Sequence, residues 1–522
     1  MQNLLELGGY KRALILIVLG LCVVAALPPI YIWPLAFVGL SGLFLFLDRC
    51  QNKKSAFLTG WYFGIGFFGG GLYWLTNAFL VDAAKHGWLI PIAVPGLAVS
   101  IGLFIGLTTL LTYLLWRNQR ENHQALGRII IFCVTWVFME WVRSWLFTGF
   151  PWNMIATIWG FSDDILQTTA YVGPFGLSFF TLLATTLSGL FFYVSGKKRL
   201  IALGCALLIP ALMWSIGYMR LLDTDDAYHD KIILRLIQPN IDQATKWKSE
   251  YRIKNFETQL NLSTAAGDPN MRPTHIIWPE TAVTFALNRE PNVLKALSTV
   301  VPSGGLVLTG TPRMTPRKQS PFQVWNSLMA VDEFGAIQAN YDKSHLVPFG
   351  EYIPLRAYNP IPKLTDGLVD FTPGTGRQTV QVGSLPSFSP LICYEIIFPN
   401  HVIDDTNRPE WLLNITNDGW YGNSPGPYQH LLSARLRSIE EGMPLVRVAN
   451  TGVSIITDSY GRIQASLPYG QRGFLDVKLH KALPTPPITA RLRSLLWIAL
   501  LLAFFALGQS LLSKRALPSY NS

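Results

Sequence analysis

Charged residues are scarce in this chain of 522 residues, because only 14% of them are Asp, Glu, Lys or Arg. Soluble globular proteins usually contain about 25% charged residues. Hydrophobic residues, in contrast, make up 50% of the chain. This composition excludes a disordered chain, a collagen-like or coiled-coil rod, and a single ordinary cytosolic domain. The length allows two or more domains.

Cysteine is also rare, and the motifs of several enzyme classes are missing. Of the five cysteines, only Cys393 lies in the polar middle of the chain, so we expect no disulfide within that part. No pair or cluster of cysteines suggests a metal site. The chain contains no G-x-S-x-G, H-E-x-x-H or Walker sequence, which leaves serine hydrolase, zinc protease and P-loop interpretations without support.

The positive charge lies in the apolar parts of the chain. Of the formal net charge of +10, residues 221–490 contribute −1 and the remaining residues +11. A nucleic-acid-binding protein would concentrate its basic residues on a polar domain, so we expect no nucleic-acid partner. Short basic loops between membrane helices explain this distribution instead.

Long apolar segments predict a polytopic membrane domain. Seven candidate transmembrane helices precede residue 220 and an eighth follows the polar region; they lie at about 13–27, 30–47, 56–80, 88–116, 128–147, 165–194, 199–219 and 494–512. The first is short and basic at its start, like a signal peptide, but further spans follow at once, so we expect it to be retained. Within the third, Gly64, Gly66 and Gly69 favour close helix packing over dinucleotide binding.

Basic residues in alternate loops predict the orientation of the spans. They fall within 11–12, 49–54, 117–128, 197–199 and 514–515, and positive loops stay in the cytoplasm. We therefore expect both termini in the cytoplasm and the polar region across the membrane, which in a bacterium is the periplasm. The expected domains are a membrane domain over 1–220, a periplasmic domain over 221–490, and a last helix with a cytoplasmic tail over 491–522.

One pair of opposite charges lies inside a predicted span. Glu140 and Arg143 are three residues apart and share one face of the helix, near its outer end. Ionisable groups in a membrane are costly and are usually functional or paired. Two interpretations stay open: a structural ion pair, and a role in binding a lipid head group or admitting substrate.

From about residue 231 the pattern changes to short β-rich segments. These lie at 232–237, 275–278, 306–309, 328–331, 390–394, 411–416, 445–449 and 454–457, with helical stretches near 250–265, 291–300 and 428–442. The alternation predicts an α/β domain in which helices cover a sheet. Residues 346–376 are rich in Pro, Gly and aromatic residues and predict a long functional loop.

Three residue types that could act together stand at the ends of β segments. Glu280 and Cys393 each end one, and Lys343 directly precedes the long loop. A thiol needs a base or a positive neighbour to become a useful nucleophile. Glu280 could take its proton, and Lys343 could hold the thiolate and then the oxyanion of a tetrahedral intermediate. Taken one at a time, Glu280 is better explained as a solvated acid, Lys343 as a surface cation and Cys393 as an inert buried thiol. Only their joint occurrence indicates an active site.

The segments around these residues resemble the nitrilase superfamily, whose members use a Glu-Lys-Cys triad on an α-β-β-α sandwich. The segments are Ile277–Thr281, Tyr341–Tyr352 and Ser389–Glu395. With the membrane spans and the tract Glu140–Trp152, the whole chain is similar to the membrane-bound N-acyltransferases of that superfamily. The resemblance implies a polytopic membrane domain of eight transmembrane helices plus an α/β nitrilase-like sandwich domain.

The resemblance also implies a role for each matching residue. Glu280 would be the general base, Lys343 the oxyanion stabiliser and Cys393 the nucleophile. Residues that match supporting positions of the active site are Glu351, Tyr394 and Glu395. Trp247 matches a tryptophan on a flexible arm near the site; by itself it would predict core packing or an anchor at the membrane interface.

The implied reaction is a transfer of an acyl chain in two steps through a thioester on the nucleophile. The implied donor is a phospholipid, and the implied acceptor is the N-terminal α-amine of S-diacylglyceryl-cysteine on an apolipoprotein, as the final step of lipoprotein maturation. The expected place is the inner membrane of a bacterium, with the protein as a monomer in the lipid bilayer. No cofactor and no metal are expected, because a thioester already activates the acyl group.

Two other functions compete with this one. A membrane-tethered amidase or nitrilase would use water as acceptor, although one span would suffice to tether it. A receptor or assembly scaffold that kept an old fold would not need the thiol of Cys393 at all.

Overall fold

The chain divides into two compact units in the computed structural model, which describes residues 5, 7–116, 124–222, 224, 227–356, 358 and 369–513. The first unit contains Met1–Tyr73, Leu89–Asp223 and Pro487–Ser522, and the second contains Trp74–Trp88 and Thr224–Pro486. From the sequence, residues 74–88 were expected in the membrane domain. In the structure they group with the second unit, because the indole N–H of the buried Trp74 donates a hydrogen bond to Gln429 Oε1 at 3.0 Å.

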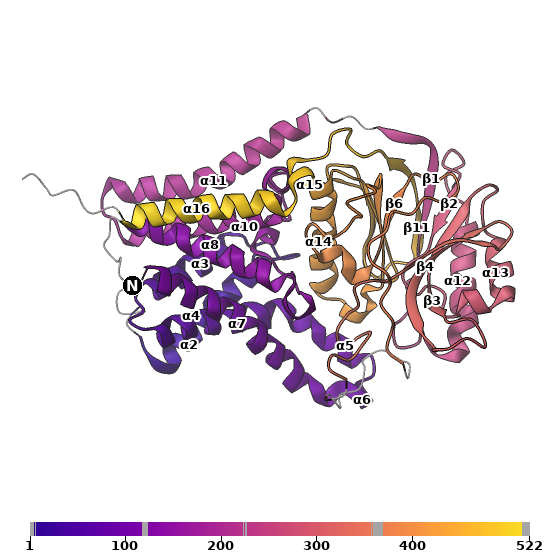
Figure 1. Cartoon of the computed structure of the whole chain (residues 1–522), viewed down its shortest axis with the longest axis horizontal. Coiled ribbons are helices and arrows are strands. Elements are labelled where there is room, and N and C mark those ends of the chain that lie inside the picture. The colour runs from indigo at the N-terminus through magenta and orange to yellow at the C-terminus, as the bar shows by residue number, and fades with distance from the viewer. Residues whose placement is uncertain are drawn as a thin grey trace, which may run out of the picture. The chain divides into compact units, whose positions relative to one another are not determined.

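The first unit is helical (Figure 1). Its long helices are α2 (Gly9–Val24), α3 (Pro34–Asp48), α4 (Lys53–Leu72), α7 (Ile90–Trp116), α8 (Ala125–Arg143), α10 (Thr169–Leu187), α11 (Lys197–Leu222) and α16 (Ser494–Ser513). Short helices lie between them, at η4 (Leu146–Thr148), η5 (Ile155–Trp159), α9 (Asp163–Leu166), η6 (Ser188–Phe192) and α15 (Ile488–Leu492). Gly64 of α4 contacts α7 so closely that a Cβ atom on it would lie 2.8 Å from Gly102 Cα, as expected for close helix packing.

Five helical segments of the described residues are long and apolar enough to cross a membrane. They are Ala83–Trp116, Ala125–Arg143, Thr169–Phe192, Lys197–Leu222 and Ser494–Ser513. The sequence pattern predicts eight, but α2 and α3 have only 16 and 15 residues, fewer than the ~20 that span a bilayer. Helix α4 begins with two lysines and contains six glycines. The full count of eight and the orientation stay predictions, and the basic residues in 117–123 and 514–515 lie outside the described residues.

The second unit contains two β-sheets. The six-stranded sheet has the order β11 (Gly473–His480), β1 (Tyr228–Gln238), β2 (His275–Ile277), β3 (Leu306–Met314), β4 (Val324–Asp332) and β5 (Ile337–Asp342). The five-stranded sheet has the order β10 (Ile463–Leu467), β9 (Ser454–Thr457), β8 (Leu445–Ala449), β7 (Trp411–Thr416) and β6 (Phe388–Ile392). Strands β1, β2 and β3 run parallel, as do β6, β7 and β8, and the remaining pairs are antiparallel.

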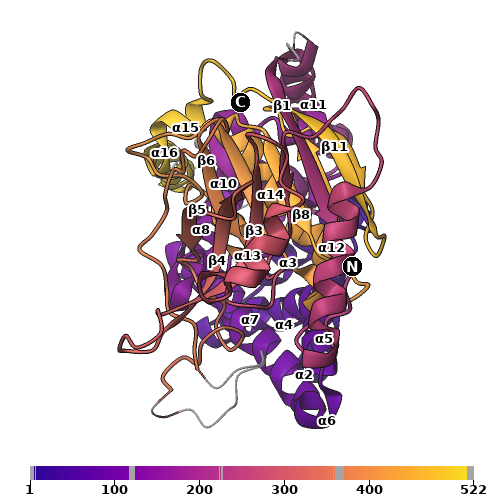
Figure 2. The ribbon, with the colours of Figure 1, turned by 90° about the vertical axis from the view of Figure 1, so that its right-hand side faces the viewer.

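The sheets pack face to face and helices cover their outer faces (Figures 1 and 2). One core joins the sheets through side chains such as Leu234 and Ile277 of the first and Leu413 and Val446 of the second. Helices α12 (Arg252–Thr264) and α13 (Pro291–Ser298) cover the six-stranded sheet over a second core, and α14 (Gly426–Glu441) covers the other sheet. This layering is the α-β-β-α sandwich that the resemblance implied.

Smaller elements lie between these helices and strands, the first four of them within residues 73–89, between α4 and α7. They are η1 (Tyr73–Leu75), α5 (Thr76–Leu80), α6 (Ala83–His86), η2 (Gly87–Leu89), η7 (Ser249–Tyr251), η8 (Leu287–Arg289), η9 (Cys393–Ile397) and η10 (Asp418–Tyr421). Of the predicted loop 346–376, residues 357 and 359–368 lie outside the described residues. Its Leu355 is 79% exposed.

Candidate active site

Glu280 stands on a tight turn directly after β2. The next residue, Thr281, has a φ of 45°, in the left-handed region that costs energy for a residue with a side chain. Two backbone hydrogen bonds hold the turn against β3: Gly310 N–H donates to Pro279 O at 3.2 Å, and Val283 N–H donates to Gly310 O at 3.1 Å. The strained backbone is therefore fixed by its neighbour, and it turns the carboxylate of Glu280 into the buried site.

Lys343 follows β5, and its buried ammonium contacts two carboxylates. Its Nζ lies 2.9 Å from Glu351 Oε2 and 3.8 Å from Glu280 Oε1. Asn326 of β4 joins the two acids, because its side-chain amide donates to Glu280 Oε1 at 2.8 Å and to Glu351 Oε1 at 2.9 Å. Glu351 Oε2 also accepts the N–H of Val347 at 2.8 Å. Residues up to 71 positions apart in the sequence thus form one hydrogen-bonded cluster.

Cys393 stands at the end of β6, at the first position of η9. Its φ is 53°, so the nucleophile candidate also occupies a strained turn at a strand end. Burial, Glu280 and Asp418 raise the pKa of its thiol, Lys343 and a hydrogen bond from Thr416 lower it, and together they bring it to about 12. Because the charges of Glu280 and Lys343 act on this thiol, the structure brings these two residues and Cys393 into one site.

The charge of Lys343 is stabilised by its neighbours. Burial alone would lower the pKa of Lys343, but Glu351, Glu280 and Cys393 outweigh burial and raise it. The group is therefore a permanent cation at neutral pH. A fixed cation beside a thiol and a carboxylate suits the stabilisation of a developing oxyanion.

A buried network that was not predicted from the sequence supports the backbone of Cys393. Asn414 Nδ2 and His430 Nε2 lie 3.3 and 3.2 Å from the carbonyl oxygen of Cys393. His430 Nδ1 lies 2.9 Å from Asp418 Oδ1, and Arg447 donates to Asp418 Oδ2 at 2.7 Å and to Asn414. Burial opposes the charge of Asp418, but Arg447 and His430 lower its pKa to about 2.

Glu395 and Tyr394, next to the nucleophile, have different surroundings. Glu395 Oε1 accepts hydrogen bonds from Tyr341 OH and from the backbone of Ser344 and His345, at 2.8 to 3.0 Å. Burial raises the pKa of Glu395, and the N–H of Ile392 lowers it. The ring of Tyr394 packs on Phe398 with centroids 5.1 Å apart. Glu395 thus ties the nucleophile turn to the segment that carries Lys343.

Trp247 lies half-buried in the segment 239–248, which follows β1. This segment is held at the ends of the other strands: Ile241 N–H donates to Asn450 Oδ1 at 3.1 Å, and Gln243 Oε1 accepts from Asn417 Nδ2 at 2.6 Å. A role of Trp247 toward substrate stays a prediction.

Glu140 and Arg143 lie in the first unit, where both are buried and hold backbone groups. Glu140 Oε1 accepts the N–H of Ile155 at 2.9 Å, and Arg143 donates to the carbonyl oxygen of Trp152 at 2.7 Å. The guanidinium also lies 5.3 Å from the ring centre of Phe68. These contacts favour a structural role in fixing the segment after α8, and substrate binding by the pair stays a prediction.

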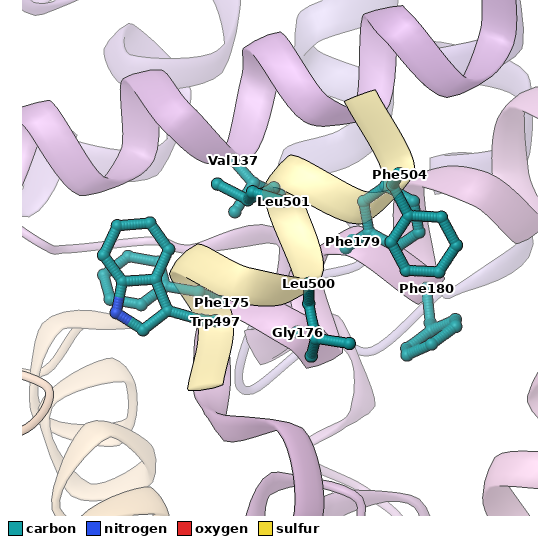
Figure 3. Close-up of a pocket in the computed structure, with 9 residues that line it drawn as sticks. All are labelled: Val137, Phe175, Gly176, Phe179, Phe180, Trp497, Leu500, Leu501 and Phe504. Atoms are coloured by element: carbon teal, nitrogen blue, oxygen red, sulfur yellow. The ribbon is translucent and has the colours of Figure 1, made fainter. Parts of the chain in front are cut away.

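An apolar pocket in the first unit lies among α8, α10 and α16 (Figure 3). Its lining residues are Val137, Phe175, Gly176, Phe179, Phe180, Trp497, Leu500, Leu501 and Phe504. They include no ionisable side chain, so this pocket offers no acid, base or nucleophile. Among the described residues, no group of three or more His, Cys, Asp or Glu is placed to hold a metal ion.

The chain matches two family models over most of its length. The Apolipoprotein N-acyltransferase N-terminal domain matches residues 19–187, and the Carbon-nitrogen hydrolase domain matches residues 234–483. The Apolipoprotein N-acyltransferase of Rhodopseudomonas palustris is 36% identical over 93% of this chain and 92% of its own length. That of Rickettsia prowazekii is 35% identical over 92% and 94%. Among solved structures, Saccharomyces cerevisiae Nit3, of the nitrilase superfamily, matches at 15% identity and a TM-score of 0.37, over 48% of this chain and 90% of that one.

Proposed function

Because the chain belongs to the apolipoprotein N-acyltransferase family, we propose that it moves a fatty acyl chain from a phospholipid, through a thioester on Cys393, to the N-terminal α-amine of S-diacylglyceryl-cysteine on apolipoproteins. One observation carries the assignment of the site. A buried ammonium contacts two carboxylates beside a thiol that stands on a strained strand-end turn. Such an arrangement suits covalent acyl transfer.

In the first step, Cys393 attacks an ester carbonyl of the phospholipid. The raised pKa of its thiol, about 12 and caused first by burial, keeps it protonated at neutral pH, so a base must take the proton as the S–C bond forms. Glu280 is that base, and Lys343 stabilises the oxyanion. The ester C–O bond then breaks, Glu280 returns the proton to the leaving lysophospholipid, and the acyl chain stays on sulfur.

In the second step, the α-amine of the apolipoprotein attacks the thioester. The N–C bond forms, the C–S bond breaks, and Glu280 takes a proton from the amine and passes it to the thiolate of Cys393. The product is an amide on a triacylated lipoprotein, and the enzyme returns to its first state. This ping-pong order lets both substrates use one site in turn. The chemistry needs no cofactor and no metal.

The supporting residues follow from the same contacts. Glu351 holds Lys343, and Glu395 ties the turn of Cys393 to the segment of Lys343. For Tyr394 and Trp247 we propose contacts with the substrate chains at the edge of the site. For Glu140 and Arg143 we propose that they fix the segment after α8, which then helps to bind the substrates in the membrane domain.

The membrane helices have a physical purpose in this proposal. Both substrates bury acyl chains in the bilayer, where each methylene contributes about 0.8 kcal/mol. An enzyme that works in the membrane avoids the cost of extracting them. The proposed site of action is the bacterial inner membrane, with the sandwich in the periplasm, both termini in the cytoplasm, and a monomer as the active form.

Labelled phospholipid separates transfer from hydrolysis. Purified protein is incubated with phospholipid that carries a labelled acyl chain, with and without a diacylated lipopeptide. We expect label on the lipopeptide amine, and none there with Cys393→Ser. Release of free fatty acid at the same rate with and without the lipopeptide would instead favour a membrane-bound hydrolase. Full transfer activity of Cys393→Ser would contradict the proposal.

A further inference from the structure

A second lysine lies in the active site, and the proposed reaction does not use it. Lys246 is 1% exposed, and its Nζ donates a hydrogen bond to the backbone carbonyl of Glu280 at 3.0 Å. That carbonyl belongs to the strained turn that carries the proposed base. An ammonium has three N–H donors. Within the described part of the chain, the Glu280 carbonyl is the hydrogen-bond partner of Lys246 Nζ.

The charges of the site are out of balance without this residue. Lys343 is one cation against the two carboxylates that it contacts, Glu280 and Glu351. Moving the thiol proton from Cys393 to Glu280 leaves the surplus of negative charge unchanged and places it on sulfur. Buried charges are costly unless they are paired.

Lys246 is charged and acts on these same groups. Burial lowers its pKa to about 8, while Glu280 and Cys393 favour the charged form. At neutral pH the residue is therefore mostly an ammonium. Its neighbour along the chain, Trp247, lies in the segment 239–248, which also forms hydrogen bonds with Asn417 and Asn450, next to the ends of β7 and β8.

We propose that Lys246 is a positioning residue of the active site: its ammonium holds the backbone of Glu280, balances the negative charge that arises on Cys393, and fastens the Trp247 segment to the proposed base. The inference rests on the proposed nucleophilic role of Cys393. For the proposed reaction, the inference means that the thiol is reactive only while Lys246 holds the segment 239–248 against the turn of Glu280.

The test measures the reactivity of the thiol without any lipid substrate. The rate at which iodoacetamide alkylates Cys393 is followed by peptide mass for the wild-type protein and for K246M, K246Q, K246R and K248M. Loss of an opposite charge near a thiol raises its pKa by about one unit or more, so K246M is expected to be alkylated about tenfold more slowly. K246R keeps the charge and should recover most of the rate. K248M removes an exposed lysine two residues away and should match the wild type.

K246Q separates charge from hydrogen bonding, because glutamine can still donate to the Glu280 carbonyl. We expect K246Q to be as slow as K246M, and its measurement keeps the test decisive where K246M does not fold. A wild-type alkylation rate in either folded variant would overturn the proposal. The double variant K246M/E351Q loses one positive and one negative charge, so that Lys343 again faces a single carboxylate, Glu280. We therefore expect K246M to slow alkylation much less in the E351Q background than in the wild type. A slowing as large as in the wild type would also overturn the proposal. Absence of any acyl-enzyme in the wild type would contradict the proposed function and leave this result standing.

Discussion

At the scale of single residues, Asn326 is the side chain that joins the acids of the active site. Its one amide nitrogen donates to both Glu280 and Glu351. A hydrogen bond to a charged group contributes about 1.5–3 kcal/mol, and a buried acceptor that loses its donor costs at least as much. The orientation of the proposed base therefore depends on a residue that has no acid–base chemistry of its own.

Replacing Asn326 by leucine removes this donor at nearly constant size. We expect the rate of acyl-enzyme formation to fall by a factor that corresponds to about 1.5–3 kcal/mol. Single-turnover measurement with phospholipid checks this value. The control is Asn340→Leu on the neighbouring strand, where the side chain is exposed. Equal rates in the two variants would show that Asn326 does not orient Glu280.

The proposed catalytic residues could be predicted from the sequence, whereas most of the residues that hold them in place could not. Glu280 and Cys393 could be found because each stands at the end of a predicted β segment, and Lys343 because its motif directly precedes the long loop. Asn326, His430 and the other members of the buried network could not, since their partners come from strands and helices far along the chain. The one available signal for Asn326 was its place beside Ser327, directly before the apolar β segment 328–331.

At the scale of elements, the contact between β3 and the Glu280 turn depends on a glycine. A Cβ atom on Gly310 would lie 2.5 Å from Thr281 N and 2.7 Å from Glu280 Cα. These are backbone atoms, so they can move only if the whole turn moves. Gly310 therefore permits the close approach that fixes the strained turn.

Gly310→Ala should push the Glu280 turn away from β3. We expect a loss of stability of about 1–3 kcal/mol, as for overpacking in a core, together with a clear loss of acyl-enzyme formation. Gly473→Ala is the matched control on β11 of the same sheet, because its Cβ would meet only side-chain atoms at 3.6 Å or more. Thermal unfolding and single-turnover kinetics test both effects, and wild-type kinetics in Gly310→Ala would contradict the assigned role of the turn.

The amino end of β2 holds a buried histidine that makes stability depend on pH. Burial lowers the pKa of His275 from 6.5 to about 4. As the pH falls, His275 therefore binds a proton near pH 6.5 in the unfolded chain but only near pH 4 in the folded protein. Stability should fall as the pH decreases through this window, by about 1.4 kcal/mol for each pKa unit of the difference.

The variant His275→Asn should remove this part of the pH dependence. Unfolding midpoints in detergent between pH 7 and pH 4 are compared for the wild type, His275→Asn and the control His401→Asn, whose side chain is exposed. We expect a flatter profile for His275→Asn alone. A profile parallel to that of the wild type would mean that His275 is not held neutral.

The elements themselves followed the sequence patterns unevenly. The β-rich segments marked the inner strands of both sheets, because these strands are buried on both faces and consist of apolar runs. The partly exposed β5, β10 and β11 lack such runs and were not predicted from the sequence. That two sheets form, rather than one, follows from long-range pairing that no local pattern encodes.

At the scale of the whole molecule, the chain combines a helical unit with a sandwich of nitrilase type. Composition and charge distribution predict two such parts, because membrane helices and an α/β domain differ in both. They were insufficient for residues 74–88, where an apolar sequence belongs to the second unit: Trp74 packs on Tyr421 with ring centroids 4.5 Å apart. Hydropathy alone does not distinguish an apolar residue that faces lipid from one that packs in a protein core.

The central claim is that Cys393 carries the acyl chain between donor and acceptor, and the intact mass of the purified protein tests it most directly. After incubation with phospholipid, the account predicts an added mass of one acyl chain that maps to Cys393 and disappears when a diacylated lipopeptide is supplied. An acylated lipopeptide formed without any adduct on Cys393, or an adduct that the lipopeptide does not remove, would contradict it.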